Sequence, residues 1–235
     1  MSGSRTENFI VERFVVPDGV RLLRAGVDAK RLLEAGFTTV KCCGGTNALY
    51  LKTAIKEGTI QGPRILASGY ILSITYGHAD THFLPYHWAK EKNPCICDGV
   101  DECMKAARYT LREGADFIKM CTSGGVMSQR DRPEQTQFTL EEIKAVVEVA
   151  KNAGTLVTAH CQGTDAMHRS IEAGVKTIDH AFYPDEEAIE MGIKKKVIFV
   201  PTLSIMKRIL EGGVEAGFPP WGVQKCREAF DATVK

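Results

Sequence analysis

The chain has 235 residues, of which 44% are hydrophobic and 25% charged, a composition typical of a globular protein with enough apolar side chains for one sizeable core. Thirty basic and 29 acidic residues give a formal net charge of +1, so no charge excess predicts binding to nucleic acid or to an anionic membrane. No apolar run approaches the roughly 20 residues of a membrane span, and the first residues lack the apolar segment of a signal peptide. We therefore expect a cytoplasmic protein whose partner is a small molecule or another protein.

An alternation of helical and β-branched segments begins near residue 20. Amphipathic stretches that end in glycine precede short apolar runs, which predicts parallel βα units. The six predicted strands lie within residues 37–45, 63–69, 117–125, 155–163, 176–183 and 197–204. Glycines stand at the expected helix C-caps, where a left-handed residue is needed: Gly36, Gly58, Gly114, Gly154 and Gly174. The sequence has no obvious linker, so we expect one domain over residues 1–235.

Two architectures contain parallel βα units, the doubly wound sheet and the (β/α)8 barrel. No G-x-G-x-x-G or P-loop motif opens any helix, which weakens the case for a nucleotide-binding doubly wound sheet. The longest insertion, residues 70–99, follows the second predicted strand. A loop of that length at the C-terminal end of a barrel strand is usually functional.

Eight cysteines are scattered along the chain without the regular framework of a small secreted domain, which favours reduced thiols. The tightest group is Cys95, Cys97 and Cys103. This group lacks the C-x2-C pairing typical of structural zinc. We therefore favour thiols over a metal site there.

Three ionisable residues occupy the C-terminal parts of successive predicted strands: Lys119, His160 and His180. Strand periodicity and the convergence of parallel strand ends allow their side chains to meet in one small volume. Imidazoles suit zinc or another borderline metal. An ammonium group does not coordinate a cation, so Lys119 must be neutral, chemically modified or something other than a ligand.

Residues 117–189, together with LLEAGFTTVKCCGG and GPRILASGYILSITYGHAD, resemble the metal-dependent amidohydrolase superfamily. The resemblance is to the branch of imidazolonepropionase-like hydrolases, Xaa-Pro and Xaa-Arg dipeptidases and ochratoxin-hydrolysing enzymes, and it covers nearly the whole chain. It implies a (β/α)8 TIM-type barrel in which CO2 carboxylates Lys119. The resulting carbamate would bridge two divalent metals, for which we expect zinc, and His160 and His180 would be ligands of one of them.

The family also uses a His-x-His pair on strand one and, on strand eight, an aspartate that serves as general base. The six histidines include no His-x-His; we interpret Asp165 as an acidic residue in a first helical turn and place Asp231 on a helix. The six predicted strands therefore match strands two to seven of an incomplete barrel, and the catalytic residue is unknown. Open edges at strands two and seven lead us to expect a homo-oligomer or a complementing chain.

Three further residues are candidates for substrate binding. The resemblance places a Gly-His-x-Asp sequence near the mouth of the pocket, which makes His78 a candidate contact. Gln162 and Tyr183 follow the two candidate ligands closely in sequence. We expect structural or exposed positions for the remaining histidines, His82, His87 and His168.

The leading hypothesis is a metal-dependent hydrolase that cleaves amide C–N bonds of a dipeptide or an N-acyl amino acid by attack of activated water. An alternative is a non-catalytic fragment or subunit that needs flanking segments or a partner chain. A third hypothesis, a doubly wound binding domain unrelated to the family, predicts a sheet order that is not barrel-like.

Overall fold

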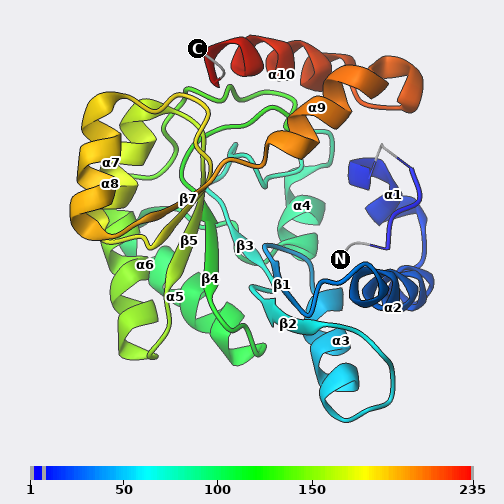
Figure 1. Ribbon diagram of the computed structural model, residues 1–235. Coiled ribbons are helices and arrows are strands. Elements are labelled where there is room, and N and C mark those ends of the chain that lie inside the picture. The colour runs from blue at the N-terminus through cyan, green and yellow to red at the C-terminus, as the bar shows by residue number, and fades with distance from the viewer. Residues whose placement is uncertain (1–2, 7–8, 234–235) are drawn as a thin grey trace.

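The computed structural model describes residues 3–6 and 9–233. Helices separate most of the successive strands among these residues, and the strands pair with one another in parallel (Figure 1). The strands are β1 (Thr39–Cys42), β2 (Arg64–Ala67), β3 (Ile71–Leu72), β4 (Ile118–Cys121), β5 (Val157–Cys161), β6 (Thr177–His180) and β7 (Ile198–Val200). The helices are α1 (Phe9–Val15), α2 (Asp18–Glu34), α3 (Asn47–Lys56), α4 (Tyr86–Lys92), α5 (Gly99–Arg112), α6 (Leu140–Asn152), α7 (Thr164–Ala173), α8 (Glu186–Lys195), α9 (Leu203–Gly212) and α10 (Pro220–Thr233), with a 3-10 turn at Val214–Ala216. All six predicted strands are present.

The five predicted C-cap glycines all adopt positive φ, as the sequence analysis expected. Gly174, with φ of 102°, ends α7 in the left-handed conformation, which glycine adopts without the steric cost of a Cβ. Helix α6 begins with a capping box, in which Thr139 accepts from the Glu142 backbone N–H and Glu142 accepts from that of Thr139. Local sequence signals therefore set these helix ends.

The strands form two sheets, one of order β3-β4-β5-β6-β7 and one of order β1-β2. Between β2 and β3 the chain bends at Gly69, which has φ of 65°. Asp116, just before β4, ties the bend to the larger sheet: its carboxylate accepts from the Ala67 backbone N–H at 2.8 Å, and its own N–H donates to the Ala67 carbonyl at 2.7 Å. The second predicted strand is thus followed by a separate short strand, so that one segment pairs first with β1 and then with β4.

The strands curve around a common interior. Lys41 on β1 donates to the hydroxyl of Thr177 on β6 at 2.8 Å. In a flat sheet of this strand order, β1 and β6 would be roughly 19 Å apart, beyond the reach of a lysine side chain. The structure is therefore an incomplete (β/α)8 barrel, as predicted, rather than a doubly wound sheet.

Residues 70–99 are more ordered than the predicted loop, because they contain β3 and α4. Ser73 forms a parallel bridge with Ile96: its N–H donates to the Cys95 carbonyl at 3.2 Å, and its carbonyl accepts from the Cys97 N–H at 2.9 Å. Apolar side chains inside this insertion are buried in the main core, which the sequence analysis did not anticipate. The insertion is thereby fixed against the strands that carry the candidate site.

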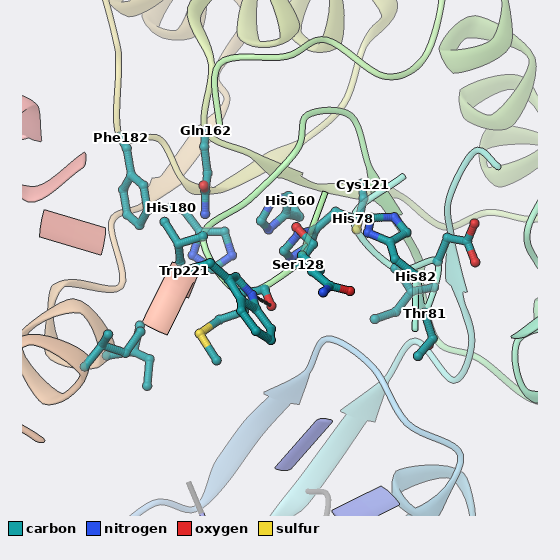
Figure 2. Close-up of a pocket in the computed structure, with 18 of the residues that line it drawn as sticks. His78, Thr81, His82, Cys121, Ser128, His160, Gln162, His180, Phe182 and Trp221 are labelled. Carbon is teal, nitrogen blue, oxygen red and sulfur yellow. Dashed lines mark hydrogen bonds between the residues drawn. The ribbon is translucent and has the colours of Figure 1, made fainter. Parts of the chain in front are cut away.

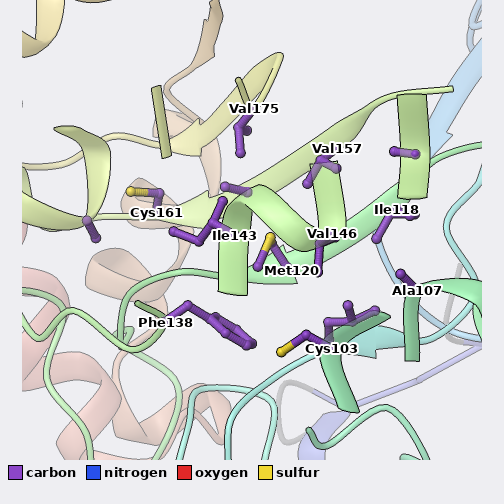
Figure 3. Packing of buried hydrophobic residues seen from close by; sticks show 14 of the residues in the cluster. Cys103, Ala107, Ile118, Met120, Phe138, Ile143, Val146, Val157, Cys161 and Val175 are labelled. Atoms are coloured by element: carbon purple, nitrogen blue, oxygen red, sulfur yellow. The ribbon is translucent and has the colours of Figure 1, made fainter. Parts of the chain in front are cut away.

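The main core lies between the five-stranded sheet and helices α5 to α8, which cover its outer face (Figures 1 and 3). Every residue of β4 and β5 is buried, as expected for parallel strands covered on both faces. Met120 and Val157 on the strands belong to one buried cluster with Ile143 and Val146 of α6. All eight cysteines are free, and Cys95, Cys97 and Cys103 lie in this apolar cluster.

Within the described residues, no helix combines the length and the apolar character needed to cross a membrane. The organisation of residues 1–235 as one domain stays a prediction.

Candidate metal and substrate site

The ring of His160 lies in contact with the rings of two other histidines, His180 and His78, of which His78 belongs to the insertion after β3. His160 is the second-last residue of β5 and lines the cavity, and His180 is the last residue of neighbouring β6. The ring of His160 stacks on that of His78 with centroids 4.0 Å apart, and it meets the His180 ring at 4.7 Å and 64° (Figure 2). The structure thus brings together two predicted metal ligands and one predicted substrate contact.

The three rings line a cavity of about 330 Å3. Gln162, Cys121, Phe182 and Trp221 also line it (Figure 2). Within the described part of the chain, the buried Oε1 atom of Gln162 has no hydrogen-bond partner. A buried amide oxygen is costly to leave unpaired, so this atom is a candidate acceptor for a bound molecule.

Hydrogen bonds at the rings decide which nitrogens can bind a ligand. Nε2 of His160 lies 2.9 Å from the Gly124 carbonyl oxygen, which can only accept, so Nε2 carries the proton and Nδ1 keeps its lone pair. Nδ1 of His180 lies 2.7 Å from the Thr202 hydroxyl. If Nδ1 donates to Thr202, Nε2 of His180 is free to accept. Each imidazole can therefore offer one nitrogen to a metal.

Burial keeps these imidazoles neutral. It lowers the pKa of His180 to about 3, and the nearby positive charge of Lys119 adds to the effect. It lowers the pKa of His78 to about 4, although the carboxylate of Asp131 opposes the shift. The pKa of His160 is also held well below its usual range, first by burial and then by the neighbouring His78. Neutral imidazole is the form that binds metals.

The backbone at His180 is strained. His180 and Ala181 have φ of 80° and 47°, and Thr202, the partner of His180, has φ of 49°. Left-handed conformations at residues other than glycine cost about 1–3 kcal/mol each and persist only where the surroundings impose them. The turn after β6 is therefore held in a conformation that directs the His180 ring towards Thr202.

Lys119 is not among the residues that line the cavity. It is only 4% exposed, and its Nζ donates a hydrogen bond to Oδ2 of Asp179, which is 6% exposed. As an ammonium partner of a carboxylate, Lys119 does not fit a metal-ligand role, whereas a carbamate would. The two imidazoles fit a divalent metal as they stand.

Asp179 is a buried site residue that was not among the sequence predictions, although its position in β6 carries a signal. In TIDH, strand alternation puts Thr177 and Asp179 on the same face, and Thr177 meets Thr158 of β5 at 2.7 Å in the interior. A carboxylate on that face is the natural partner for a lysine on β4. The lysine that stood out in the sequence therefore has a counter-ion two strands away.

Tyr183 is not among the residues that line this cavity, whereas its neighbour Phe182 is. The left-handed residues His180 and Ala181 shift the alternation of side chains after β6. Tyr183 lies against Glu134, and its pKa is raised to about 12, first by burial and then by that carboxylate.

The remaining histidines have separate environments. His82 lines the cavity and is structural as expected: its Nε2 donates to the Tyr76 carbonyl at 2.9 Å, and its Nδ1 accepts from the Arg130 N–H at 3.2 Å. His87 is exposed, as predicted. His168 is half-buried and lies 2.9 Å from Asp185.

One group of side chains on the surface has metal-like spacing among the described histidines, cysteines and acidic residues: His168, Asp185 and Glu187. Asp185 also caps α8 by accepting from the Ala188 N–H at 2.8 Å, so the group has a structural explanation. Its members come from two different helical regions, so no local sequence pattern predicts the group.

Comparisons with known proteins agree with this geometry. A model of the amidohydrolase family matches residues 23–224. Ochratoxinase from Aspergillus niger is 36% identical over 211 residues, which are 84% of this chain and 43% of that protein. Its crystal structure matches with a TM-score of 0.91 at 30% identity, covering 100% of this chain and 57% of that chain.

A Xaa-Pro dipeptidase with bound methionine in its active site matches with a TM-score of 0.83 at 32% identity, covering 94% of this chain and 59% of that chain. The chain thus spans about half the length of the relatives it matches. The family model, in contrast, covers most of the present sequence. On this evidence the chain belongs to the amidohydrolase family.

Proposed function

We propose that this chain provides the central part of a metal-dependent hydrolase that cleaves amide C–N bonds in small molecules. The observation that carries the proposal is the pair of neutral imidazoles, His160 and His180, at the ends of adjacent strands and on the wall of one cavity. An ochratoxinase and a Xaa-Pro dipeptidase among the similar proteins support a hydrolase of this class. We propose a dipeptide or an N-acyl amino acid as the substrate.

His160 through Nδ1 and His180 through Nε2 would hold a divalent metal, for which zinc suits the nitrogen donors. Such a metal supplies Lewis-acid chemistry, polarising a carbonyl and lowering the pKa of water. The carbonyl of Gly124 and the hydroxyl of Thr202 fix the orientation of the two rings. In known metal sites, partners of this kind orient the ligands.

Lys119 would join the metal site as a carbamate. A new N–C bond would form between its Nζ and CO2, and the ammonium would release two protons, of which the carboxylate of Asp179 can accept one and the surrounding water the other. Asp179 would then no longer serve as the counter-ion of an ammonium. The ion pair in the structure and the carbamate are therefore two alternative states of Lys119.

His78 and Gln162 are the substrate contacts that the cavity supports. Both line it, and the unpaired Oε1 of Gln162 can accept from an amide N–H of a substrate. Tyr183 is not proposed, because it lies outside the cavity lining. The general base stays unassigned.

A second candidate function is that of a subunit or fragment that is active only with a partner chain or with additional segments. The exposed side chains of β7 and the exposed Phe37 before β1 favour it, because they offer apolar surface at both edges of the incomplete barrel. A second copy of the chain or a complementing chain would cover these edges. The expected cytoplasmic location stays a prediction.

Hydrolysis by the purified chain separates the two functions. The chain is incubated with zinc, manganese or cobalt and bicarbonate, and release of free amino acid from N-acyl amino acids and Xaa-Pro dipeptides is followed by mass spectrometry. We expect hydrolysis that falls about 100-fold or more in His160→Asn and His180→Asn, while exposed His87→Ala retains it. Metal binding without any hydrolysis would favour the second function.

A further inference from the structure

A buried lysine on the last helix is bonded to the loop that covers the candidate site. Lys225 of α10 is 8% exposed, and its Nζ donates to the carbonyl oxygens of Gly125 at 3.1 Å, Ser128 at 2.8 Å and Asp131. An ammonium group has three N–H donors, and these three carbonyl oxygens can accept from all of them. We call residues 122–137, which follow β4, the β4 loop.

Other residues of α10 contact the same loop. Trp221 donates from Nε1 to the Met127 carbonyl at 3.4 Å, and Glu228 pairs with Arg132 at 3.0 Å. A Cβ on Gly222 would lie 3.2 Å from the sulfur of Met127, so the helix and the loop approach closely. Lys225 is the buried centre of this contact, whereas the pair of Glu228 and Arg132 is exposed.

The β4 loop in turn holds His78. The carboxylate of Asp131 can only accept, and it accepts from the Ser128 hydroxyl. Because that hydroxyl proton is engaged, Nδ1 of His78, 2.8 Å from Ser128 Oγ, must donate and carry the ring proton. Nε2 of His78 is then left with a lone pair.

Two further contacts fix the position of His78. Gln137 donates from Nε2 to Asp131 at 2.9 Å, and its Oε1 accepts from the His78 backbone N–H at 3.0 Å. The His78 ring lies directly over Gly125, where an added Cβ would be 2.3 Å from His78 Cε1. A small shift of the loop would therefore displace the ring.

We propose that Lys225 is a positioning residue of the candidate site: by bonding three carbonyls of the β4 loop, it holds Ser128 and Asp131 where they fix His78 as the Nδ1–H tautomer. His78 thereby presents Nε2 as a hydrogen-bond acceptor beside His160. That a substrate donates a hydrogen bond to this Nε2 atom rests on the proposed function, whereas the tautomer of His78 does not. The last helix is in this way part of the site, although Lys225 is distant in sequence from the three histidines.

The tautomer is measured by NMR on protein labelled with 15N in its histidine rings, without metal or substrate. The His78 signals are identified by their loss in His78→Gln. We expect protonated Nδ1 and unprotonated Nε2 in the unaltered chain, and a mixture of tautomers in Lys225→Met and in Ser128→Ala. Lys225→Arg should restore the Nδ1–H form, and Lys207→Met, on the exposed side of α9, should leave it unchanged.

Hydrogen exchange gives a second measurement on the same variants. Loss of three charge-assisted hydrogen bonds in Lys225→Met should speed exchange of the amides at 124–132 by about tenfold or more, with little change in α6 and α7. If Lys225→Met does not fold, Lys225→Gln, which keeps a neutral donor, is compared in its place.

The proposal would be overturned if a folded Lys225 variant showed faster hydrogen exchange in the loop but an unchanged His78 tautomer. Lys225 would then stabilise the loop without positioning His78. The Nε2–H tautomer in the unaltered chain would overturn it as well. Absence of hydrolysis would count against the proposed function alone, since neither measurement here requires activity.

Discussion

The central strands and the edge strands of this barrel differ in how completely the chain covers them. Every residue of β4 and β5 is buried, whereas β1, β2 and β7 each contain exposed residues. Two isoleucines illustrate the difference: Ile178 on β6 is 0% exposed, and Ile198 on β7, which pairs with β6, is 62% exposed. Parallel strands are normally covered on both faces, so the edges are the unusual part.

The three candidate metal ligands lie on the covered strands. Lys119, His160 and His180 come from β4, β5 and β6, and Asp179 is the counter-ion supplied by β6. The edge strand β1 contributes Lys41, which reaches Thr177 from the opposite side of the interior. The chain can therefore assemble its candidate ligands without covering the edges of the barrel, and the two properties can be tested separately.

The largest effect should come from breaking the central ion pair. Asp179→Ala leaves the Lys119 ammonium buried without a counter-ion, which should lower the free energy of unfolding by about 3–5 kcal/mol in urea titrations. The double variant Lys119→Met, Asp179→Leu should recover most of that loss.

The matched control is Glu211→Ala, which breaks the exposed pair of Lys207 and Glu211 and should cost no more than about 1 kcal/mol. An Asp179→Ala chain that is no less stable than Glu211→Ala would show that Lys119 is not held as a buried cation. A mass increase of one CO2 on Lys119 would explain such a result.

The two isoleucines sharpen the comparison of centre and edge. Ile178→Ala removes a fully buried side chain and should cost about 2–5 kcal/mol, as large-to-small core substitutions do. Ile198→Ala should change the free energy of unfolding by no more than about 0.5 kcal/mol, because the side chain is largely exposed. A similar loss in both variants would mean that β7 is covered in solution, and sedimentation analysis would then identify a second copy.

A smaller effect is expected from the pH dependence of stability. The pKa values of His78 and His180 in the folded chain are about 4 and about 3, below the ordinary histidine value. At pH values between the folded and the ordinary pKa, the unfolded chain therefore binds more protons than the folded chain. The free energy of unfolding should therefore fall as the pH drops from about 6.5 towards 4, by up to about 1.4 kcal/mol per pH unit for each histidine.

The pH effect is measured by urea unfolding at a series of pH values. His78→Gln and His180→Gln should each reduce the slope by about one proton. Val214→Ala, which removes an exposed side chain without a titratable group, should leave it unchanged. A slope that neither histidine variant alters would contradict the assignment of neutral, buried rings.

The sequence predicted the parallel βα architecture, all six strands and the meeting of His160 with His180, because these follow from local periodicity and from the convergence of parallel strand ends. Asp179 could have been found by the same alternation. The bend at Gly69 could not, since it depends on Asp116 from a distant part of the chain.

The orientation of Tyr183 was also beyond sequence reasoning. It depends on left-handed residues at His180 and Ala181, which period-two alternation does not anticipate. The contacts of Lys225 join helix α10 to a loop far earlier in the chain: Ser128, whose carbonyl accepts from Lys225, lies 97 residues before it. Such long-range contacts are set by packing, and no local pattern predicts them.

The central claim is that His160 and His180 together hold a divalent metal. Equilibrium dialysis of the purified chain against zinc, followed by elemental analysis, tests it directly, because His168, Asp185 and Glu187 offer a competing group on the surface. We predict that the double variant His160→Asn, His180→Asn loses zinc affinity by at least about tenfold, while His168→Asn keeps it. Zinc binding that survives the double variant and disappears in His168→Asn would contradict the account.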